Sequence, residues 1–343
     1  MFYGRITGMG EKTEKKRLAI LRVLQEADRP LGSSRITEQL VAAHHEISER
    51  TVRFYLNGMD KENLTENLGR RGRRITSRGL EELASARVIE KVGFLAAKID
   101  QMTYRMSFDL ASKGGTVVVN VSLVEKSQLE AAAPLVKKVF AAGYAMGQLL
   151  TLFASGERVG ETSIPDGMVG IGTVCSITLN GVLLAHGIPT YSRFGGLLEL
   201  HDYLATRFVE IIHYNGTTLD PLEIFIRSGM TDYFGATETG NGRIGASFRE
   251  VPAESRQEVT VLARKLQEVG LGGFMTIGWP GQPLLEIPVN PGQVGAIVIG
   301  GLNPAAILEE RGIRTQSRAL AALIGYERLF PFDELDVQVQ NVL

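Results

Sequence analysis

The sequence contains almost no cysteine. Cys175 is the only cysteine among 343 residues, which excludes an internal disulfide framework and a cysteine-based zinc cluster. His44 and His45 lie before a predicted helix, and no third ligand follows at a suitable spacing, so we expect both to face solvent. The sequence therefore predicts no metal site and no cofactor, and a single cysteine suits a reducing cytoplasm.

Long apolar runs are also missing. No stretch of about 18 consecutive apolar residues could span a bilayer, and the first residues, MFYGRITGMGEK, lack the apolar core of a signal peptide. Hydrophobic residues nevertheless make up 44% of the chain and charged residues 22%, which is enough to build substantial cores. We expect a soluble, cytoplasmic protein of two or three domains with no membrane partner.

Catalytic motifs are absent as well. The segment GMGEK near the start does not match the phosphate-binding pattern GxxxxGK[ST], and no strand precedes it. No His or Asp is placed by the sequence to activate Cys175, and a thiol in an apolar strand is usually inert. We expect no catalytic residues and no enzyme. The alternative is a metabolic enzyme with an α/β domain and a winged-helix module that docks on protein or RNA.

The charge is distributed unevenly along the chain. The net charge is −1, but residues 10–87 carry 16 Lys and Arg against 12 Asp and Glu, while the residues beyond 87 carry −6. A basic segment at one end of an acidic chain favours a polyanionic partner.

Residues 10–87 have the pattern of a winged helix-turn-helix DNA-binding domain. Apolar residues recur at helical spacing in a first segment ending near Pro30, a second helix begins near Ser33, and a third follows Ser48. Ser48 is a good N-cap, and Ile47 before it can pack on Val52. After the third helix comes a short hairpin with four arginines, which resembles a wing.

The predicted contacts to double-stranded operator DNA lie on the third helix and on the wing. Arginines at the start of the helix could read guanine edges, and hydroxyl groups near its N-terminus could hold phosphates. Each phosphate contact would release condensed counterions. The predicted DNA-binding residues are Ser48, Arg50, Thr51, Arg53, Phe54, Asn57, Arg70, Arg71, Arg73 and Arg74.

The rest of the chain contains an internal sequence repeat. GIPTYSR at 187–193 matches GIRTQSR at 312–318, and IPDGMVG at 164–170 lies over IPVNPGQVG at 287–295. Such self-similarity indicates two copies of one structural unit. We therefore predict an α/β fold in which the winged helix is followed by an internally duplicated regulatory domain. Its expected parts are a connector helix at 88–101, a first lobe at 102–213 and a second, similar lobe at 214–335.

Each copy predicts the same order of elements. Alternating residues in MTYRMSFDL (102–110) and TVVVNVSLV (116–124) predict a hairpin joined through Gly114-Gly115. A long helix follows, at 129–153 in the first copy and 252–269 in the second. A buried apolar strand comes next, and Asn180 or Asn303 is expected to cap a short helix. That helix should end at Gly187 or Gly312 in the left-handed conformation, and the repeated GIxTxSR segment should begin a strand.

The repeated segment offers groups that bind small anions. Two hydroxyl groups and one guanidinium recur in both copies, and an arginine fork matches a carboxylate. If the two strands met, they could hold a dicarboxylate, and Gly195-Gly196 would let it approach the backbone. Alternatively, each arginine closes a local salt bridge with Glu199 or Glu327. The residues of the repeat are Thr190, Ser192, Arg193, Thr315, Ser317 and Arg318.

The segments GTVCSITLNGVLLAHGIP and SRFGGLLEL resemble the regulatory domain of NrpR, the nitrogen regulatory repressor of methanogenic archaea. The resemblance covers nearly the whole chain, and it implies a homodimeric repressor that binds palindromic operators near nitrogen-assimilation genes. It also implies that 2-oxoglutarate binds the regulatory part and releases DNA. The family signatures fall on Val174-Cys175-Ser176 and Ser192 to Gly196, which adds Cys175, Ser176, Asn180, Gly195 and Gly196 to the expected effector site.

One feature departs from the resemblance. Some members carry two full regulatory domains after the winged helix, whereas this chain has room for one that is itself duplicated. The chain could repress alone or with a partner that supplies another regulatory domain.

Overall fold

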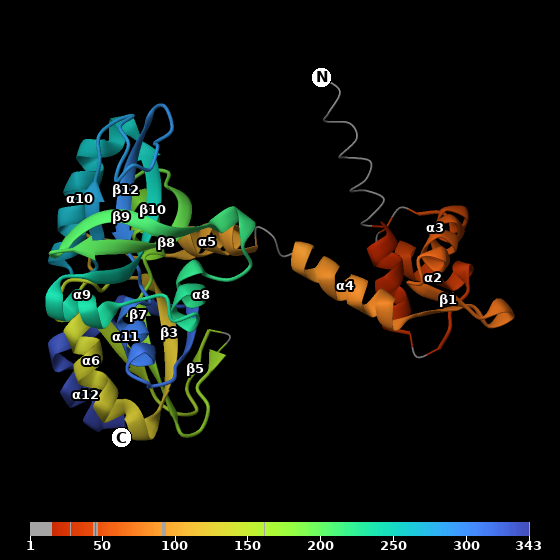
Figure 1. Cartoon of the computed structure of the whole chain (residues 1–343), viewed down its shortest axis with the longest axis horizontal. Helices are drawn as coiled ribbons and strands as arrows, with labels where there is room; N and C mark the ends of the chain where they lie inside the picture. The colour runs from red at the N-terminus through yellow and green to blue at the C-terminus, as the bar shows by residue number, and fades with distance from the viewer. Residues whose placement is uncertain are drawn as a thin grey trace. The chain divides into compact units, whose positions relative to one another are not determined.

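The computed structural model describes residues 16–27, 29–43, 45, 47–90, 94–160 and 162–342. These residues belong to two compact units, residues 1–91 and 92–343 (Figure 1). His44 lies outside the described residues, and His45 is exposed, as predicted.

The first unit is a winged helix. Residues 16–25 are helical, and the elements that follow are α2 (Ser33–Ala42), α3 (Glu49–Lys61), β1 (Thr65–Asn67), the 3-10 turn η1 (Gly69–Arg71), β2 (Arg73–Ile75) and α4 (Ser77–Glu90). Its core takes one stripe from each of the first three helices, in which Ile20, Ile36, Val52, Leu56 and Met59 are fully buried. The predicted three helices and basic hairpin are confirmed.

The second unit begins with a helix and continues as two α/β halves. The first half contains α5 (Phe94–Arg105), β3 (Thr116–Glu125), η2 (Lys126–Gln128), α6 (Leu129–Ala141), β4 (Leu149–Phe153), β5 (Arg158–Val159), β6 (Thr162–Ser163), β7 (Met168–Val174), α7 (Ile177–Ala185), β8 (Tyr191–His201) and β9 (Leu204–His213). The expected connector at 88–101 therefore falls on the end of α4 and the start of α5.

The second half repeats this order. It contains η3 (Tyr214–Gly216), α8 (Pro221–Arg227), α9 (Tyr233–Thr239), β10 (Gly242–Pro252), η4 (Ala253–Ser255), α10 (Arg256–Glu268), β11 (Phe274–Ile277), β12 (Gln293–Ile299), α11 (Asn303–Glu310), β13 (Gln316–Gly325), η5 (Tyr326–Arg328), β14 (Phe330–Pro331), η6 (Phe332–Glu334) and α12 (Leu335–Val342). Thus β3, α6, β4, β7, α7 and β8 correspond in order to β10, α10, β11, β12, α11 and β13.

The two halves exchange strands. One five-stranded sheet has the order β13-β3-β7-β4-β14, and the other has the order β11-β12-β10-β8-β9. Strand β8 of the first half pairs antiparallel with β10 of the second, while β13 of the second pairs antiparallel with β3 of the first. The halves expected at 102–213 and 214–335 are consecutive segments of the chain, but each sheet contains strands from both segments.

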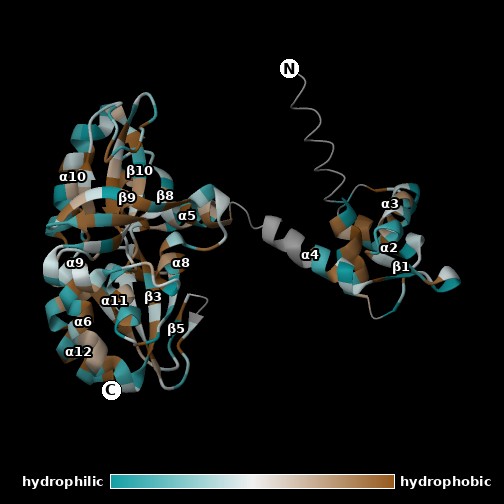
Figure 2. Cartoon of the chain, viewed as in Figure 1, coloured by the Kyte–Doolittle hydropathy of each residue, from teal (hydrophilic) through white to brown (hydrophobic). Residues whose placement is uncertain are grey.

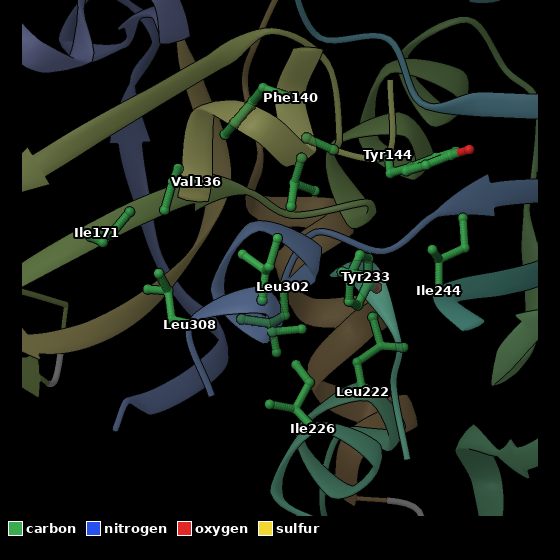
Figure 3. Close-up of a cluster of buried hydrophobic side chains, with 14 of the residues drawn as sticks. Val136, Phe140, Tyr144, Ile171, Leu222, Ile226, Tyr233, Ile244, Leu302 and Leu308 are labelled. Carbon is green, nitrogen blue, oxygen red and sulfur yellow. The ribbon is translucent and has the colours of Figure 1, made fainter. Parts of the chain in front are cut away.

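The main core joins these halves. Figure 3 shows side chains from α6, β7, α8, β10 and α11 packed together, among them Val136, Ile171, Leu222, Ile244 and Leu308. The strands that line the interior are predominantly hydrophobic, whereas the outer faces of the helices carry most of the polar residues (Figure 2). Separating the halves would expose this shared core, so the second unit folds as one body.

Three local predictions are wrong. Residues 102–105 continue α5 instead of forming a hairpin strand, because Leu95, Ile99 and Met102 bury one face of that helix. Helix α6 ends at Ala141, and of the residues expected to extend it, 142–148 form a loop and 149–153 form β4. Neither asparagine caps its helix, since Asn180 lies inside α7, which begins at Ile177, and Asn303 is already the first residue of α11, whose N-cap is Leu302.

Other local predictions are confirmed. Gly187 and Gly312 adopt left-handed φ angles of 75° and 79°, and both follow the short helices as predicted.

Candidate nucleic-acid interface and candidate effector site

Helix α3 starts at a well-formed cap. The Ser48 hydroxyl accepts a hydrogen bond from the Thr51 backbone N–H at 3.3 Å, which satisfies one of the unpaired donors of the first turn. Because Val52, Leu56 and Met59 face the core, the opposite face of the helix turns outward. That face presents the exposed Arg50 and the Phe54 ring, of which 73% is accessible.

The wing has an exposed arginine tip. Arg70 and Arg71 lie on the 3-10 turn between the strands and are exposed. Gly72 follows with a φ of 101°, and a Cβ there would lie 2.5 Å from the Leu31 carbonyl carbon. Only glycine fits this contact, which fixes the base of the wing. In the part of the chain that the structure describes, Arg50, Arg70 and Arg71 form no ion pair.

Other predicted DNA-binding residues have partners inside the unit. Arg73 donates to the Asp60 carboxylate at 2.9 Å and to the Asn57 amide oxygen at 2.8 Å, which ties the wing to α3. Arg53 pairs with Glu49, and Arg74 pairs with Glu66 at 2.7 Å. Hydrogen bonds from Arg53 and Ser33 lower the pKa of Glu49.

In the regulatory unit, several predicted effector residues surround an arginine that the sequence analysis did not select. Arg249 of β10 is 1% exposed. One guanidinium nitrogen donates to the Ser176 carbonyl at 2.8 Å and to the Asn180 amide oxygen, and another donates to the Ser176 hydroxyl at 2.8 Å. The Asn180 amide donates in turn to the Ser192 hydroxyl at 3.1 Å. The sequence feature that could have identified Arg249 is its charge within the otherwise largely apolar strand segment GASFREV.

The surroundings of Arg249 carry little negative charge. No carboxylate forms an ion pair with this guanidinium within the described ranges, and its Nε has no hydrogen-bond partner. Burial lowers the pKa of Arg249 and raises the pKa of the neighbouring Cys175 thiol to about 11. At neutral pH the thiol is therefore protonated and poorly reactive.

Arg193 is held by a different carboxylate from the one expected. It donates to Glu250 at 2.9 Å, and that carboxylate is 1% exposed. Glu199, the predicted partner, pairs instead with Arg207 at 2.9 Å. Thr190, three residues earlier, has a buried hydroxyl without a hydrogen-bond partner.

The two glycines of the first copy are needed for packing. A Cβ at Gly195 would lie 2.9 Å from a Pro221 side-chain carbon, and a Cβ at Gly196 would lie 2.6 Å from the Glu210 carbonyl oxygen. Both distances are shorter than normal contacts, so a larger residue would displace α8 or β9.

The second copy of the motif lines a cavity of about 500 Å³, which we call the Arg318 cavity. Ser317 is fixed by a hydrogen bond of 2.8 Å to Ser122 of β3, and Thr315 donates to Glu309 at 2.9 Å. The lining residues are Val121, Leu123, Ser163, Pro165, Arg227, Gln316, Ser317 and Arg318. Two guanidinium groups and two hydroxyl groups thus surround a space suited to a small anion.

A buried carboxylate lies beside this cavity. Glu223 of α8 is 12% exposed and lies 3.7 Å from Arg227. Its Oε1 accepts a hydrogen bond from the Ala319 N–H at 2.6 Å, at a bulge in β13 where Leu320 has a φ of 51°. Burial raises the pKa of Glu223. The bulge therefore connects the cavity to the strand that the second half donates.

The two copies of the motif do not form one site across two adjacent strands. Strand β8, with Ser192 and Arg193, belongs to one sheet, and β13, with Ser317 and Arg318, belongs to the other. One copy contributes to the hydrogen-bonded network around Arg249, and the other lines an open cavity. In the described part of the chain no group of His, Cys, Asp and Glu could hold a metal ion, and no helix is long and apolar enough to cross a membrane.

These features define a regulator with a winged-helix unit and a duplicated α/β unit. Residues 92–330 match the family described as NrpR regulatory domains NRD1 and 2, and residues 18–83 match the ribonuclease R winged-helix domain. The chain belongs to the NrpR family of nitrogen regulators.

Three proteins illustrate the relationship. The chain is 33% identical to the global nitrogen regulator NrpRI of Methanosarcina mazei over 94% of its length and 99% of that protein. It is 31% identical to the global nitrogen regulator NrpR of Methanococcus maripaludis over 89% of its length, but spans 53% of that protein. A crystal structure of a nitrogen repressor-like protein from Methanococcus jannaschii is similar with a TM-score of 0.59 and 27% identity, covering 69% of this chain and 97% of that one.

Proposed function

We propose that this protein is a transcriptional repressor of nitrogen-assimilation genes that binds operator DNA as a homodimer and releases it on binding 2-oxoglutarate. The observation that carries the proposal is the combination, in one chain of the NrpR family, of a winged helix with exposed arginines and a regulatory unit with an arginine-lined cavity.

The DNA contacts would come from the outward face of α3 and the wing tip. Arg50 and Phe54 would enter the major groove, while Arg70 and Arg71 would contact phosphates beside it. Arg73 and Asn57 would hold the wing against α3, which keeps the two contact regions in a fixed relation. Ser48 and Thr51 would favour a phosphate near the helix N-terminus.

The effector would bind in the Arg318 cavity. A dicarboxylate has two charges to neutralise, and Arg318 and Arg227 are the two cationic groups of the lining. Ser317 and Gln316 would supply hydrogen bonds to the oxo group and to the nearer carboxylate. In this interpretation the network of the first half, in which Ser176 and Asn180 bind Arg249 and Ser192 binds Asn180, maintains the structure that the second copy uses.

Effector binding would act through α8 and β13. A carboxylate at Arg227 competes with Glu223, and Glu223 also accepts the Ala319 N–H of the β13 bulge. A change at Glu223 would therefore reach β13, which packs against α5, the helix that follows the winged-helix unit in the sequence. A coupling of about 1–3 kcal/mol would change operator affinity roughly 5–150-fold.

Gel shifts on the upstream region of the protein's own gene test the proposal, with 2-oxoglutarate titrated against the complex. We expect binding that weakens with salt and release by 2-oxoglutarate. Arg227→Ala and Arg318→Ala should keep operator binding and lose release, whereas Arg243→Ala, an exposed arginine of β10, should behave like the wild type. RNA binding is a second candidate function, because residues 18–83 match the ribonuclease R winged-helix domain. Competition of double-stranded RNA with the operator tests this candidate.

A further inference from the structure

The internal repeat leaves one groove uncovered. In the sheet that contains β3, β4 and β7, β14 pairs with the outer side of β4, and Phe332 stacks on Phe140 of α6 with ring centres 5.3 Å apart. In the other sheet, β11 is the last strand, and no segment among the described residues covers its outer side as β14 covers β4. A cavity of about 560 Å³ lies there, between α10, β11 and the loop that follows α6. We call it the α10 cavity.

The residues that line the α10 cavity differ in charge from their counterparts. Helices α6 and α10 have the same length, so Arg256 and Arg264 of α10 occupy the positions of Leu129 and Lys137 of α6. Leu129 is 1% exposed, and Lys137 pairs with Asp336 of α12. Compared with α6, helix α10 therefore has the cation Arg256 in place of a buried leucine. It also has a cation without an ion pair among the described residues, Arg264, in place of a lysine that pairs with Asp336.

The lining combines positive charge with an apolar surface. Arg256, Arg264, Gln148, Gln267 and Thr260 supply polar groups, and Phe274, Ile277 and Ile299 supply hydrophobic ones. No Asp or Glu lines the cavity, and Arg264 forms no ion pair in the part of the chain that the structure describes. Such a lining suits a ligand with an anionic group and an apolar part, because the anionic group can contact the arginines while the apolar part packs on the hydrophobic side chains.

The spacing of the two arginines sets the size of the ligand. Arg256 and Arg264 are eight residues apart on α10, which places their Cα atoms about 12 Å apart along the helix. An elongated ligand can contact both. Arg256 is oriented by Trp279, since its guanidinium lies 3.7 Å from the ring centre and its Nε donates to the Gly278 carbonyl at 2.7 Å.

We propose that the α10 cavity binds a nucleoside phosphate, with the phosphates at the arginines and the base against Phe274 and Ile277. This site is separate from the Arg318 cavity and shares no lining residue with it. The loop at Gly143–Gln148 comes from the first half, and the Gln148 N–H donates to the Gly270 carbonyl of the second half at 2.8 Å. A ligand here would contact residues of both halves.

Trp279 makes the proposal directly testable. It is the only tryptophan of the chain and is 59% exposed, so its emission reports on a change at Arg256. The full chain is titrated with ADP, and binding is followed by tryptophan emission and by calorimetry. We expect a saturable change in emission, with affinity at least tenfold weaker in Arg264→Ala and unchanged within twofold in Lys265→Ala, a neighbouring exposed cation outside the lining.

Further measurements test whether an emission change or heat with ADP comes from binding in the α10 cavity. Arg264 is exposed, so its variant should melt at the wild-type temperature; Arg264→Lys should recover part of the affinity. Inorganic pyrophosphate should bind more weakly than ADP, and equal affinity would overturn the role of the base. ADP binding should persist in Arg318→Ala and in the presence of 2-oxoglutarate, which separates this site from the proposed effector site. Absence of both heat and emission change with ADP would refute the proposal.

Discussion

Arg249 of β10 and Asn180 of α7 come from different halves of the duplicated unit and meet in its interior through a direct hydrogen bond. The same guanidinium binds Ser176, so one side chain ties the start of α7 to the strand of the opposite half. A buried guanidinium without a carboxylate is costly unless its hydrogen bonds are made. This contact therefore links the two halves in the interior and contributes to the stability of the unit.

Replacing Arg249 tests that conclusion. Arg249→Ala leaves the Ser176 carbonyl and the Asn180 amide without their partner and opens a cavity, so we expect the free energy of unfolding to fall by about 3 kcal/mol. Arg243→Ala, on the same strand but exposed, should change it by less than about 0.5 kcal/mol. Urea denaturation followed by Trp279 emission measures both. Equal stability of the two variants would mean that the network around Arg249 contributes little.

The N-cap of α3 predicts an effect confined to the winged-helix unit. Ser48→Ala removes the acceptor for the Thr51 N–H, which should destabilise this unit by about 1 kcal/mol. Ser34→Ala is the control, because the Ser34 hydroxyl is exposed and makes only a long bond of 3.4 Å to Glu38. Amide hydrogen exchange measures each unit separately. Faster exchange in the regulatory unit of the Ser48 variant would contradict the prediction.

The pH dependence of stability should contain a contribution from Asp220. Burial and the nearby Glu223 raise the pKa of Asp220 to about 7, whereas an unfolded aspartate has a pKa of about 3.9. Between these values the folded state holds a proton that the unfolded state has lost, so this group makes the protein less stable as pH rises from about 4 to 7. Above that range its contribution is constant.

Asp220→Asn should remove this slope without removing the helix cap. The Asp220 carboxylate caps α8 by accepting the Leu222 N–H at 2.9 Å, and the amide oxygen of Asn can accept the same bond. Asp232→Asn, at the cap of α9, controls for the change of residue type. Urea denaturation at a series of pH values compares the slopes. An unchanged slope in the Asp220 variant would assign the pH dependence to other groups.

The sequence predicted the elements that depend on local patterns. The stripe of Val52, Leu56 and Met59, the Ser48 cap and the glycines after the short helices follow from spacing and backbone geometry alone. The exchange of β8 and β13 could not be predicted, because pairing between distant strands leaves no local signal. A charged residue in an apolar strand marks Arg249 in the sequence, but its role was missed because its partners Ser176 and Asn180 precede it by 73 and 69 positions.

The candidate DNA interface was predicted more completely than the effector site. A winged helix uses residues that are close in the sequence, so the exposed tip of Arg70 and Arg71 could be predicted from the sequence. The Arg318 cavity also needs Arg227, which the repeat does not contain and which reaches the cavity only through the packing of α8 beside β13. The repeated motif predicted the strand that carries Arg318, whereas the position of Arg227 beside it depends on tertiary packing.

The wing tip gives the final prediction. Arg70→Ala and Arg71→Ala should each weaken operator binding and lower the slope of log affinity against log salt by about 1, because each removes one phosphate contact. Sequence preference should stay the same, since phosphate contacts carry no base information. Arg74→Ala should have a smaller effect, because Arg74 already pairs with Glu66 at 2.7 Å. Gel shifts at several salt concentrations on an operator and on unrelated DNA measure slope and preference together. If Arg50→Ala instead changes the slope alone and leaves the preference intact, α3 is not the helix that reads the bases.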